Sequence, residues 1–321
     1  MDHKIKIVYP DSERSEVERN IESFDRLRAF ADFQIFTGRP VDNAEFVARI
    51  HDADGILLGW GMPGDVMRQA KNLQVVSFAG IGVAQFVDLA QARERGIGVC
   101  NCPGYSNNTV AEHALALLLG VARHLARLDS SLRKGEWNQS IDGFELSGTT
   151  IGLIGFGGIG QTFARLCKAL GMEVLVWTRN MSDQRSAKYG VTFAPLATLY
   201  ERCDVISLHA AYNAETANLI DHDAFAQMKT GALLINTARA ELVDEAALID
   251  ALNSGKLGGA GLDVFWHEPL PADHPLTSMD NVIISPHVGF NTQQAVNRLF
   301  DIATNNLVQY FQGNPINQVT E

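Results

Sequence analysis

The sequence predicts an α/β protein with two doubly wound domains, each built on a parallel β-sheet. Two observations support this fold class. Short apolar runs of strand length alternate with helical patterns along most of the chain, which is typical of parallel sheets covered by helices on both faces. At 321 residues the chain is also longer than one hydrophobic core comfortably supports, so two domains are expected.

The predicted elements form two successive α/β series. The first has candidate strands at 5–9, 33–36, 55–59, 73–78 and 97–100, separated by helical patterns such as 43–50 and 86–95. An amphipathic helix that begins near Asn107 or Asn108 and runs toward Leu128 is long enough to connect two domains. The second series has candidate strands at 151–155, 174–177, 191–193, 205–208, 233–236, 261–264 and 282–285, before a last helix at about 292–311. We expect one domain at 1–104 plus 290–321 and the other at 105–289.

The most informative motif follows the strand at 151–155 and reads Gly155-Phe156-Gly157-Gly158-Ile159-Gly160. In this Gly-x-Gly-x-x-Gly pattern the first glycine permits a tight turn. The second lets the backbone approach a pyrophosphate, and the third allows a helix to pack closely on the sheet. The N-terminus of that helix then faces the phosphates. Because a strand, a helix and a second strand at 173–178 surround the motif, the sequence predicts a Rossmann dinucleotide-binding domain.

The choice of cofactor depends on the end of that second strand. Domains that bind NAD usually have Asp or Glu there, about 20 residues after the glycines, where it binds the ribose hydroxyls. This chain has Thr178, Arg179 and Asn180 instead. Without the carboxylate nothing repels a 2′-phosphate, and a planar guanidinium suits phosphate well. We therefore expect NADP(H) to be favoured, with NAD(H) possible; alternatively, Arg179 only stacks on the adenine or points into solvent.

Composition limits the partners and the location of the protein. The formal charge of -11 would repel nucleic acid and anionic membranes. No apolar run approaches the ~20 residues of a membrane span, and residues 1–6 lack the apolar core of a signal peptide. We expect a cytoplasmic protein without nucleic-acid or membrane partners. The four cysteines lack the spacing of a metal site and are expected in the core, so no metal is predicted; they are Cys100, Cys102, Cys167 and Cys203.

Three side chains are candidates for chemistry on an alcohol or ketone. Such a reaction needs a group that exchanges a proton with oxygen, commonly a histidine oriented by a carboxylate, and a cation that holds the substrate. In open α/β sheets these groups lie at the carboxyl ends of strands. Arg239, Glu268 and His287 follow three predicted strands. Taken singly, each could be structural, and Arg239 could pair with Glu241 or Asp244.

The segments 236–244, 261–270 and 285–289 resemble the motifs of the D-isomer-specific 2-hydroxyacid dehydrogenases, and so do the glycine loop and 103–113. The resemblance covers essentially the whole chain and implies a flavodoxin-like substrate domain beside the Rossmann domain. It implies that Arg239 binds the carboxylate and carbonyl of a 2-oxo acid, that His287 acts as acid and base, and that Glu268 hydrogen-bonds to His287. By the same resemblance further cofactor-binding residues are His209, Thr216, Thr237, Ala238, Asp263 and Gly289. The implied substrate-binding residues are Ala79, Gly80, Ile81 and Gly82, with the amides of 80–82 donating to the substrate carboxylate.

The family resemblance leads to a functional hypothesis with two alternatives. The leading hypothesis is an NAD(P)H-dependent reductase of small 2-oxo acids of the glyoxylate and hydroxypyruvate class. The alternatives are phosphoglycerate dehydrogenase and a nucleotide-sensing protein similar to the family's corepressors. A homodimer formed through 108–128 and 135–137 is also implied. Large apolar side chains could form the walls of a substrate pocket, although core packing would explain them equally; they are Trp60, Met62, Phe78 and Trp266.

Overall fold

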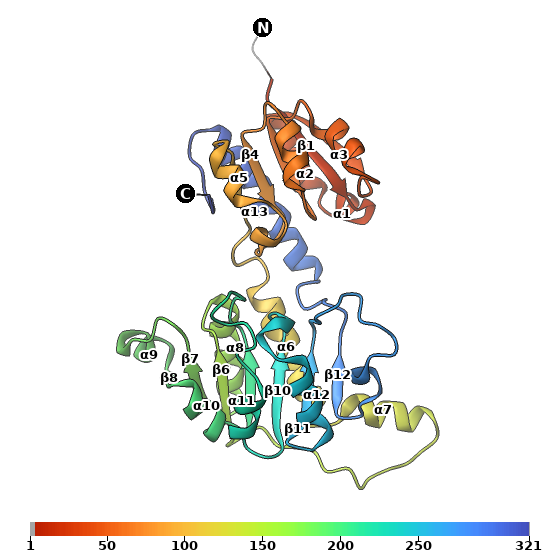
Figure 1. Cartoon of the computed structure of the whole chain (residues 1–321), viewed down its shortest axis with the longest axis vertical. Helices are drawn as coiled ribbons and strands as arrows, with labels where there is room; N and C mark the ends of the chain where they lie inside the picture. The colour runs from red at the N-terminus through yellow and green to blue at the C-terminus, as the bar shows by residue number, and fades with distance from the viewer. Residues whose placement is uncertain (1–3, 321) are drawn as a thin grey trace. The chain divides into compact units, whose positions relative to one another are not determined.

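The computed structural model describes residues 4–320 and divides into two compact units (Figure 1). Unit 1 comprises Met1–Tyr105 and Thr292–Glu321, and unit 2 comprises Ser106–Asn291. Each unit has a parallel sheet with helices on both faces, so the predicted α/β fold class is confirmed.

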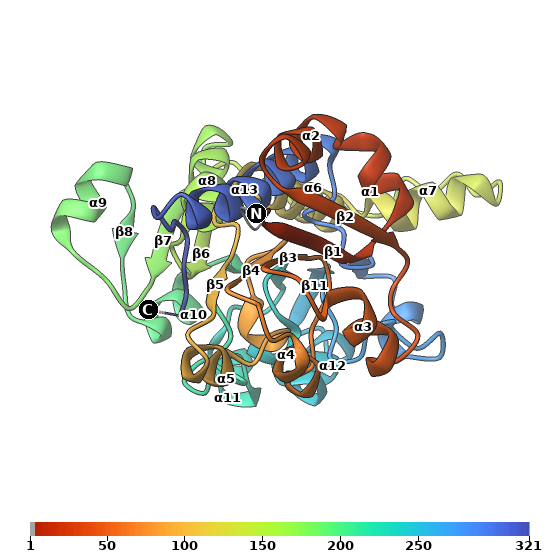
Figure 2. The same cartoon turned by 90° about the horizontal axis from the view of Figure 1, so that it is seen from above.

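The sheet of unit 1 has the strand order β2-β1-β3-β4-β5, which is the flavodoxin-like order that the resemblance implied. Its strands are β1 (Lys6–Ser12), β2 (Asp32–Thr37), β3 (Gly55–Leu58), β4 (Val75–Phe78) and β5 (Gly98–Cys100). Figure 2 shows α2 (Ile21–Phe30) and α13 (Gln293–Phe311) on one face of this sheet. The opposite face carries α3 (Asn43–Ile50), α4 (Gly64–Gln69) and α5 (Leu89–Glu94), and α1 (Arg14–Arg19) precedes α2.

The core of unit 1 needs both ends of the chain. Helix α13 contributes Ala295, Leu299, Phe300, Ala303 and Leu307, all of which are buried. They pack in one cluster with Ile7 and Tyr9 of β1 and with Phe24 and Leu27 of α2. One face of the N-terminal sheet is therefore covered by a helix that is nearly 200 residues away in the sequence.

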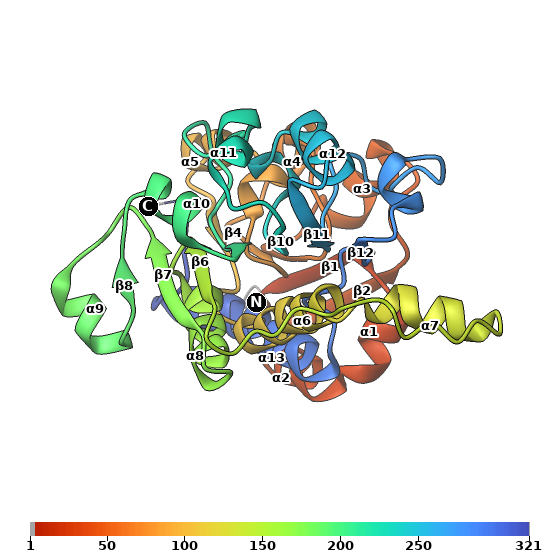
Figure 3. The same ribbon diagram turned by 90° about the horizontal axis from the view of Figure 1, so that it is seen from below.

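The sheet of unit 2 has the order β12-β11-β10-β9-β6-β7-β8, a Rossmann order with one added strand. Its strands are β6 (Thr150–Ile154), β7 (Glu173–Trp177), β8 (Thr192–Phe193), β9 (Val205–Leu208), β10 (Ala232–Asn236), β11 (Leu257–Leu262) and β12 (Val282–Ile284). In Figure 3, α6 (Asn107–Ala122) and α8 (Gly158–Ala169) cover one face. The other face carries α10 (Leu196–Arg202), α11 (His222–Gln227) and α12 (Glu245–Asn253), while α9 (Asp183–Tyr189) lies beside β8.

The helix expected from Asn107 or Asn108 to Leu128 is interrupted at 123–124, so its last residues belong to a separate helix. Helix α6 ends at Ala122, and a separate helix, α7 (Leu125–Arg133), begins after His124. His124 has a φ of 51°, and a residue in the left-handed region cannot continue a right-handed helix. Nine residues of α6 are buried, whereas none of α7 is, so the chain leaves the core at this break.

The strand predicted at 261–264 was also misplaced, because β11 starts at Leu257. Three of the six residues of this strand are glycines, so its first half lacks the run of apolar side chains that predicts a buried strand. A Cβ at Gly259 would lie 2.6 Å from the Asn281 carbonyl oxygen, and one at Gly261 would lie 2.9 Å from Cβ of Leu117 on α6. The glycines therefore let α6 and the neighbouring strand approach closely.

The four cysteines are free and buried, which confirms their assignment to the core. Burial raises the pKa of the Cys102 thiol to about 12 and that of the Cys203 thiol to about 12. Within residues 4–320 no group of three metal-ligating side chains occurs. No helix in that range has the length and apolar character that a bilayer span requires.

Candidate active site

Two of the three candidate reactive side chains are hydrogen-bonded to each other. Arg239, Glu268 and His287 follow β10, β11 and β12, which are neighbours in the sheet of unit 2. The His287 Nδ1 atom lies 2.8 Å from Oε2 of Glu268, and the side chains are 39% and 38% exposed. The second oxygen of Glu268 accepts from the Phe265 amide at 3.0 Å, which fixes the carboxylate. With Nδ1 donating to the carboxylate, Nε2 is the atom that can exchange a proton with a ligand.

Arg239 keeps its guanidinium available. Its Nη1 donates to the Ala238 carbonyl at 2.7 Å, and no carboxylate among residues 4–320 forms an ion pair with it. The alternative pairing with Glu241 or Asp244 is therefore wrong; Asp244 instead accepts from the Ala247 amide as the N-cap of α12. The guanidinium can bind an anion such as a substrate carboxylate.

A buried carboxylate holds the loop that carries His287. His287 has a φ of 52°, a left-handed conformation that costs a non-glycine residue about 1–2 kcal/mol. The amides of Val288 and Gly289 donate to Asp263 at 3.0 and 2.8 Å, and the Ser285 hydroxyl donates to it at 2.6 Å. These bonds stabilise the loop on both sides of His287 and offset the cost of its backbone conformation.

Asp263 is only 2% exposed, yet it is held as a carboxylate. Burial by itself would raise the pKa of Asp263, but hydrogen bonds from His113, Ser285 and the two loop amides outweigh burial and lower that pKa. His113 on α6 lies 2.9 Å from Ser285 Oγ and 3.3 Å from Asp263 Oδ1. Sequence reasoning assigned Asp263 to the cofactor and missed this role. His113 is 150 residues away, and no local pattern signals the contact.

The glycine loop fits a dinucleotide. Gly155 has a φ of 102°, and a Cβ there would lie 2.4 Å from backbone atoms of His209 and Ala210. A Cβ at Gly160 would lie 2.6 Å from the Gly155 oxygen, whereas one at Gly157 would meet nothing within 4 Å. The three glycines thus provide the turn, the close helix packing and the open backbone surface that a pyrophosphate requires.

Two further residues of the motif, Gly158 and Ile159, begin α8. A Cβ at Gly158 would lie 2.2 Å from the Asn107 side chain, so α8 starts in close contact with the first residue of α6. Ile159 is half-buried and packs against the core between these helices. Both residues shape the loop through packing.

The loop after β7 is tied to the glycine loop. Arg185 on α9 donates to the carbonyl of Asn180 and, at 3.1 Å, to that of Phe156. Thr178 is half-buried at the end of β7, whereas the Arg179 side chain is 64% exposed. The Arg179 Nη1 atom lies 3.5 Å from Oε2 of Glu215, a partner that the sequence did not suggest.

Four other predicted cofactor-binding residues differ in burial and in hydrogen bonding; they are Thr237, Ala238, Thr216 and His209. The hydroxyl of Thr237 is buried and has no hydrogen-bond partner among the described residues. A buried polar atom of this kind can accept a bond from a ligand. The neighbouring Ala238 donates its amide to Asn236. Thr216 is 4% exposed, and its hydroxyl bonds to the Ala211 carbonyl within its own loop.

His209 packs inside unit 2 beside the glycine loop. Its ring centroid lies 5.0 Å from that of Phe163 on α8, and its Nε2 lies 3.0 Å from Ser207 Oγ. Burial lowers the pKa of His209 to about 3, so the ring is neutral near pH 7. Its backbone also limits the space next to Gly155. His209 supports the turn of the glycine loop.

The predicted substrate-binding segment lies after β4 in unit 1, and of its three predicted donor amides that of Gly80 is already bonded. The Gly80 amide donates to the Phe78 carbonyl at 2.9 Å, and the Ala79 amide donates to the Leu58 carbonyl at 2.8 Å. The Gly80 amide is occupied because the chain turns tightly there, and a Cβ at Gly80 would lie 2.5 Å from the Phe78 ring. The Ala79 amide continues the pairing of β4 with β3. The amides of Ile81 and Gly82 have no acceptor among residues 4–320.

The candidate pocket walls divide into two groups. Met62 and Phe78 are buried in the core of unit 1, so the structural alternative is correct for both. Trp266 is half-buried and donates to the Val243 carbonyl. Trp60 is partly exposed, with the Arg39 guanidinium 3.6 Å from its ring centroid.

Known proteins are similar to this chain in sequence and in fold. The family model described as "D-isomer specific 2-hydroxyacid dehydrogenase, NAD binding domain" matches residues 115–289. A hydroxypyruvate reductase from Blautia hydrogenotrophica is 35% identical over 288 residues, which are 87% of this chain and 89% of that protein. A D-3-phosphoglycerate dehydrogenase from Archaeoglobus fulgidus is 39% identical over 253 residues, but the match spans only 48% of its length and 78% of this chain. The structure of an acyclic imino acid reductase in complex with NADPH and D-Arg superposes with a TM-score of 0.86 at 28% identity, over 98% of this chain and 100% of that one.

Proposed function

The chain belongs to the D-isomer specific 2-hydroxyacid dehydrogenase family of NAD(P)-dependent oxidoreductases, and we propose that it reduces small 2-oxo acids of the glyoxylate and hydroxypyruvate class. The observation that carries this proposal is the 2.8 Å bond between His287 and Glu268. Arg239 follows the neighbouring strand β10 and forms no ion pair with a carboxylate among residues 4–320. The similarity to a hydroxypyruvate reductase over most of both chains supports the substrate class.

Each of the three side chains has one role in the proposed mechanism. The loop of Gly155, Gly157 and Gly160 would hold a nicotinamide cofactor, which would supply the hydride for the carbonyl carbon. Arg239 holds the substrate carboxylate and carbonyl oxygen through two N–H donors, which orients the carbon. His287 donates the proton on Nε2 to the oxygen, and Glu268 holds the ring through Nδ1 and stabilises the charged imidazole before transfer.

We assign the nucleotide to unit 2, and within unit 1 we keep two backbone amides as candidates for binding a carboxylate. Gly155, Gly157 and Gly160 support the first assignment, since their geometry fits a pyrophosphate. The candidates in unit 1 are the amides of Ile81 and Gly82, which have no acceptor among residues 4–320 and can bind a carboxylate oxygen.

Within this function NADP(H) is the preferred cofactor. No carboxylate follows β7, and the exposed Arg179 guanidinium can bind a 2′-phosphate. The relative with NADPH bound supports this preference. NAD(H) binds more weakly in this proposal because it lacks the phosphate that Arg179 would hold.

One experiment tests the function and its alternatives. Oxidation of NADPH is followed with glyoxylate, hydroxypyruvate, pyruvate, a phenyl 2-oxo acid and 3-phosphohydroxypyruvate. The proposal expects the highest kcat/KM for glyoxylate or hydroxypyruvate. A preference for 3-phosphohydroxypyruvate would favour a phosphoglycerate dehydrogenase. Tight cofactor binding without turnover of any acid would favour a nucleotide-sensing protein.

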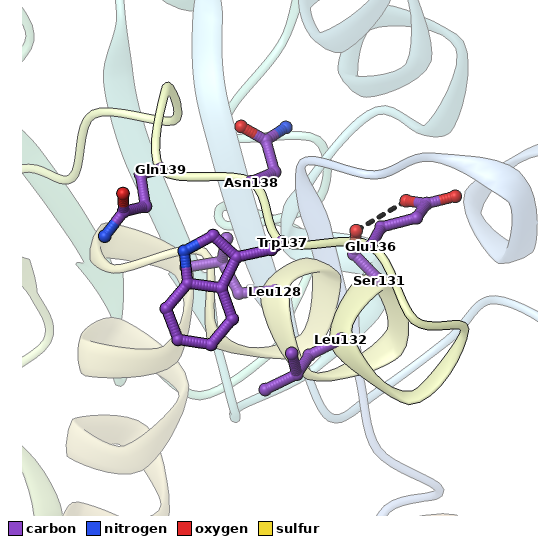
Figure 4. A pocket seen from close by; sticks show the side chains of 7 residues that line it. All are labelled: Leu128, Ser131, Leu132, Glu136, Trp137, Asn138 and Gln139. Atoms are coloured by element: carbon purple, nitrogen blue, oxygen red, sulfur yellow. Dashed lines mark hydrogen bonds between the residues drawn. The ribbon is translucent and has the colours of Figure 1, made fainter.

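The protein is proposed to act as a homodimer formed through residues 125–137, which contain α7. Leu125, Leu132 and Trp137 are exposed there, the tryptophan by 78%. Figure 4 shows Trp137 alongside Leu128 at a hollow of about 160 Å³. Exposed apolar side chains of this size are typical of interfaces. Light scattering should give twice the 35.1 kDa chain mass, and Trp137→Asp should lower the mass toward one chain.

A further inference from the structure

An ion pair joins the two loops that flank the glycine loop. In the sheet of unit 2, β6 lies between β9 and β7, and the three strands are parallel. The glycine loop follows β6, Arg179 follows β7, and Glu215 lies in the loop after β9. Since the carboxyl ends of parallel strands meet at one edge, the Arg179–Glu215 pair lies at the edge where the nucleotide would bind.

The backbones on both sides of this pair are held in place. Arg185 fixes the loop after β7 by its bonds to the carbonyls of Asn180 and Phe156. On the other side, the Glu215 amide donates to Asn213 Oδ1 at 2.9 Å. The two side chains themselves are 64% and 74% exposed. The ion pair can therefore open without movement of either loop.

We propose that Glu215 is a specificity-determining residue that competes with the 2′-phosphate of NADPH for Arg179. The inference rests on the proposed NADP(H) preference. Binding of a 2′-phosphate to Arg179 requires the N–H donor that faces Glu215 to leave this carboxylate for the phosphate. NADH has no 2′-phosphate, so its binding leaves the Arg179–Glu215 pair intact. Glu215 thus limits the preference for NADPH, a function usually served by a carboxylate at the end of the second strand.

The test measures dissociation constants of both cofactors by fluorescence titration, which needs no turnover. Glu215→Gln keeps the shape of the side chain and removes its charge. An exposed ion pair is weak, so the ratio of the NADH to the NADPH dissociation constant should rise about two- to fivefold at low salt. The increase should shrink as salt is added, because exposed charges are screened.

Two comparisons make the result specific. Glu201→Gln removes the same charge from an exposed position on α10 and should leave the ratio unchanged. Arg179→Gln should lower the ratio. In the Arg179→Gln background, the further change Glu215→Gln should leave the ratio unchanged. The guanidinium for which the carboxylate and the phosphate compete is absent from that variant.

The possible failures can be told apart. An unchanged ratio in Glu215→Gln, together with a lowered ratio in Arg179→Gln, would overturn the inference and leave the cofactor preference standing. An unchanged ratio in Arg179→Gln would overturn both. If Glu215→Gln had its full effect without Arg179, the carboxylate would act directly on the phosphate, and competition for Arg179 would be the wrong explanation.

Discussion

Replacing Asp263 with asparagine should destabilise unit 2 strongly despite the similar size of the two side chains. Asp263 accepts hydrogen bonds from the amides of Val288 and Gly289 and from Ser285, and His113 lies 3.3 Å away. A hydrogen bond to a charged group contributes about 1.5–3 kcal/mol, and a buried donor left without an acceptor costs about 1–3 kcal/mol. The asparagine keeps one acceptor oxygen and points an NH₂ group at donors. We expect the free energy of unfolding to fall by about 2–4 kcal/mol at pH 7.

The free energy of unfolding that Asp263→Asn removes should decrease at low pH. The pKa of Asp263 is lowered in the folded protein, so the unfolded chain takes up the proton first as pH falls. The stabilisation is complete above the unfolded carboxyl pKa of about 3.9 and is lost as pH falls through the lower folded value. The difference between wild type and Asp263→Asn should therefore stay constant from about pH 7 to about pH 5 and narrow below about pH 4.

Urea unfolding followed by tryptophan fluorescence measures this difference. Three of the four tryptophans, Trp137, Trp177 and Trp266, belong to unit 2, so the signal reports mainly on that unit. Asp273→Asn, at an exposed position, should change stability by less than about 0.5 kcal/mol. If Asp263→Asn were as stable as Asp273→Asn at pH 7, the carboxylate would not hold the loop. A difference that already narrowed between pH 7 and pH 5 would contradict the lowered pKa.

Three further predictions concern the reaction and the cofactor. Glu268→Gln should lower kcat about a hundredfold or more, because the carboxylate that stabilises the charged His287 ring is lost; unchanged turnover at saturating substrate would exclude the assigned coupling. Arg239→Lys should raise the substrate KM about ten- to a hundredfold, because an ammonium cannot make the two-pronged contact, and a KM within twofold of wild type would contradict this role. Gly160→Ala should lower the melting temperature through its clash with backbone. Gly157→Ala should fold normally and weaken cofactor binding in a fluorescence titration; the reverse pattern would refute the assigned glycine roles.

The fold and the positions of the reactive residues could be predicted because their signals are local. A strand pattern that runs into Gly155, Gly157 and Gly160 identifies a nucleotide loop without knowledge of distant contacts. Parallel strands bring their carboxyl ends to one edge, so residues that follow three strands are expected at the same edge. The bond between Glu268 and His287 agrees with that expectation.

The features that could not be predicted depend on distant partners or on a single backbone angle. Asp263 contacts His113, which is 150 residues earlier in the sequence. Arg179 and Glu215 form an ion pair because their loops follow β7 and β9, the two strands that flank β6 in the sheet. The break between α6 and α7 depends on the left-handed conformation of His124. Occupation of the Gly80 amide depends on a turn that the residue sequence alone does not specify.

The dependence of unit 1 on α13 has a consequence for protein synthesis. Unit 2 is one continuous segment and can fold while the chain is still being translated, whereas unit 1 waits for Leu299, Phe300 and Leu307 to emerge. About 200 residues separate β5 from these side chains, which is roughly 10–40 s at ~5–20 residues per second. During that interval α2 is present on one apolar face of the N-terminal sheet, but α13 is not. The nascent N-terminal part of unit 1, which ends at Tyr105, is therefore the stretch on which a ribosome-associated chaperone would act.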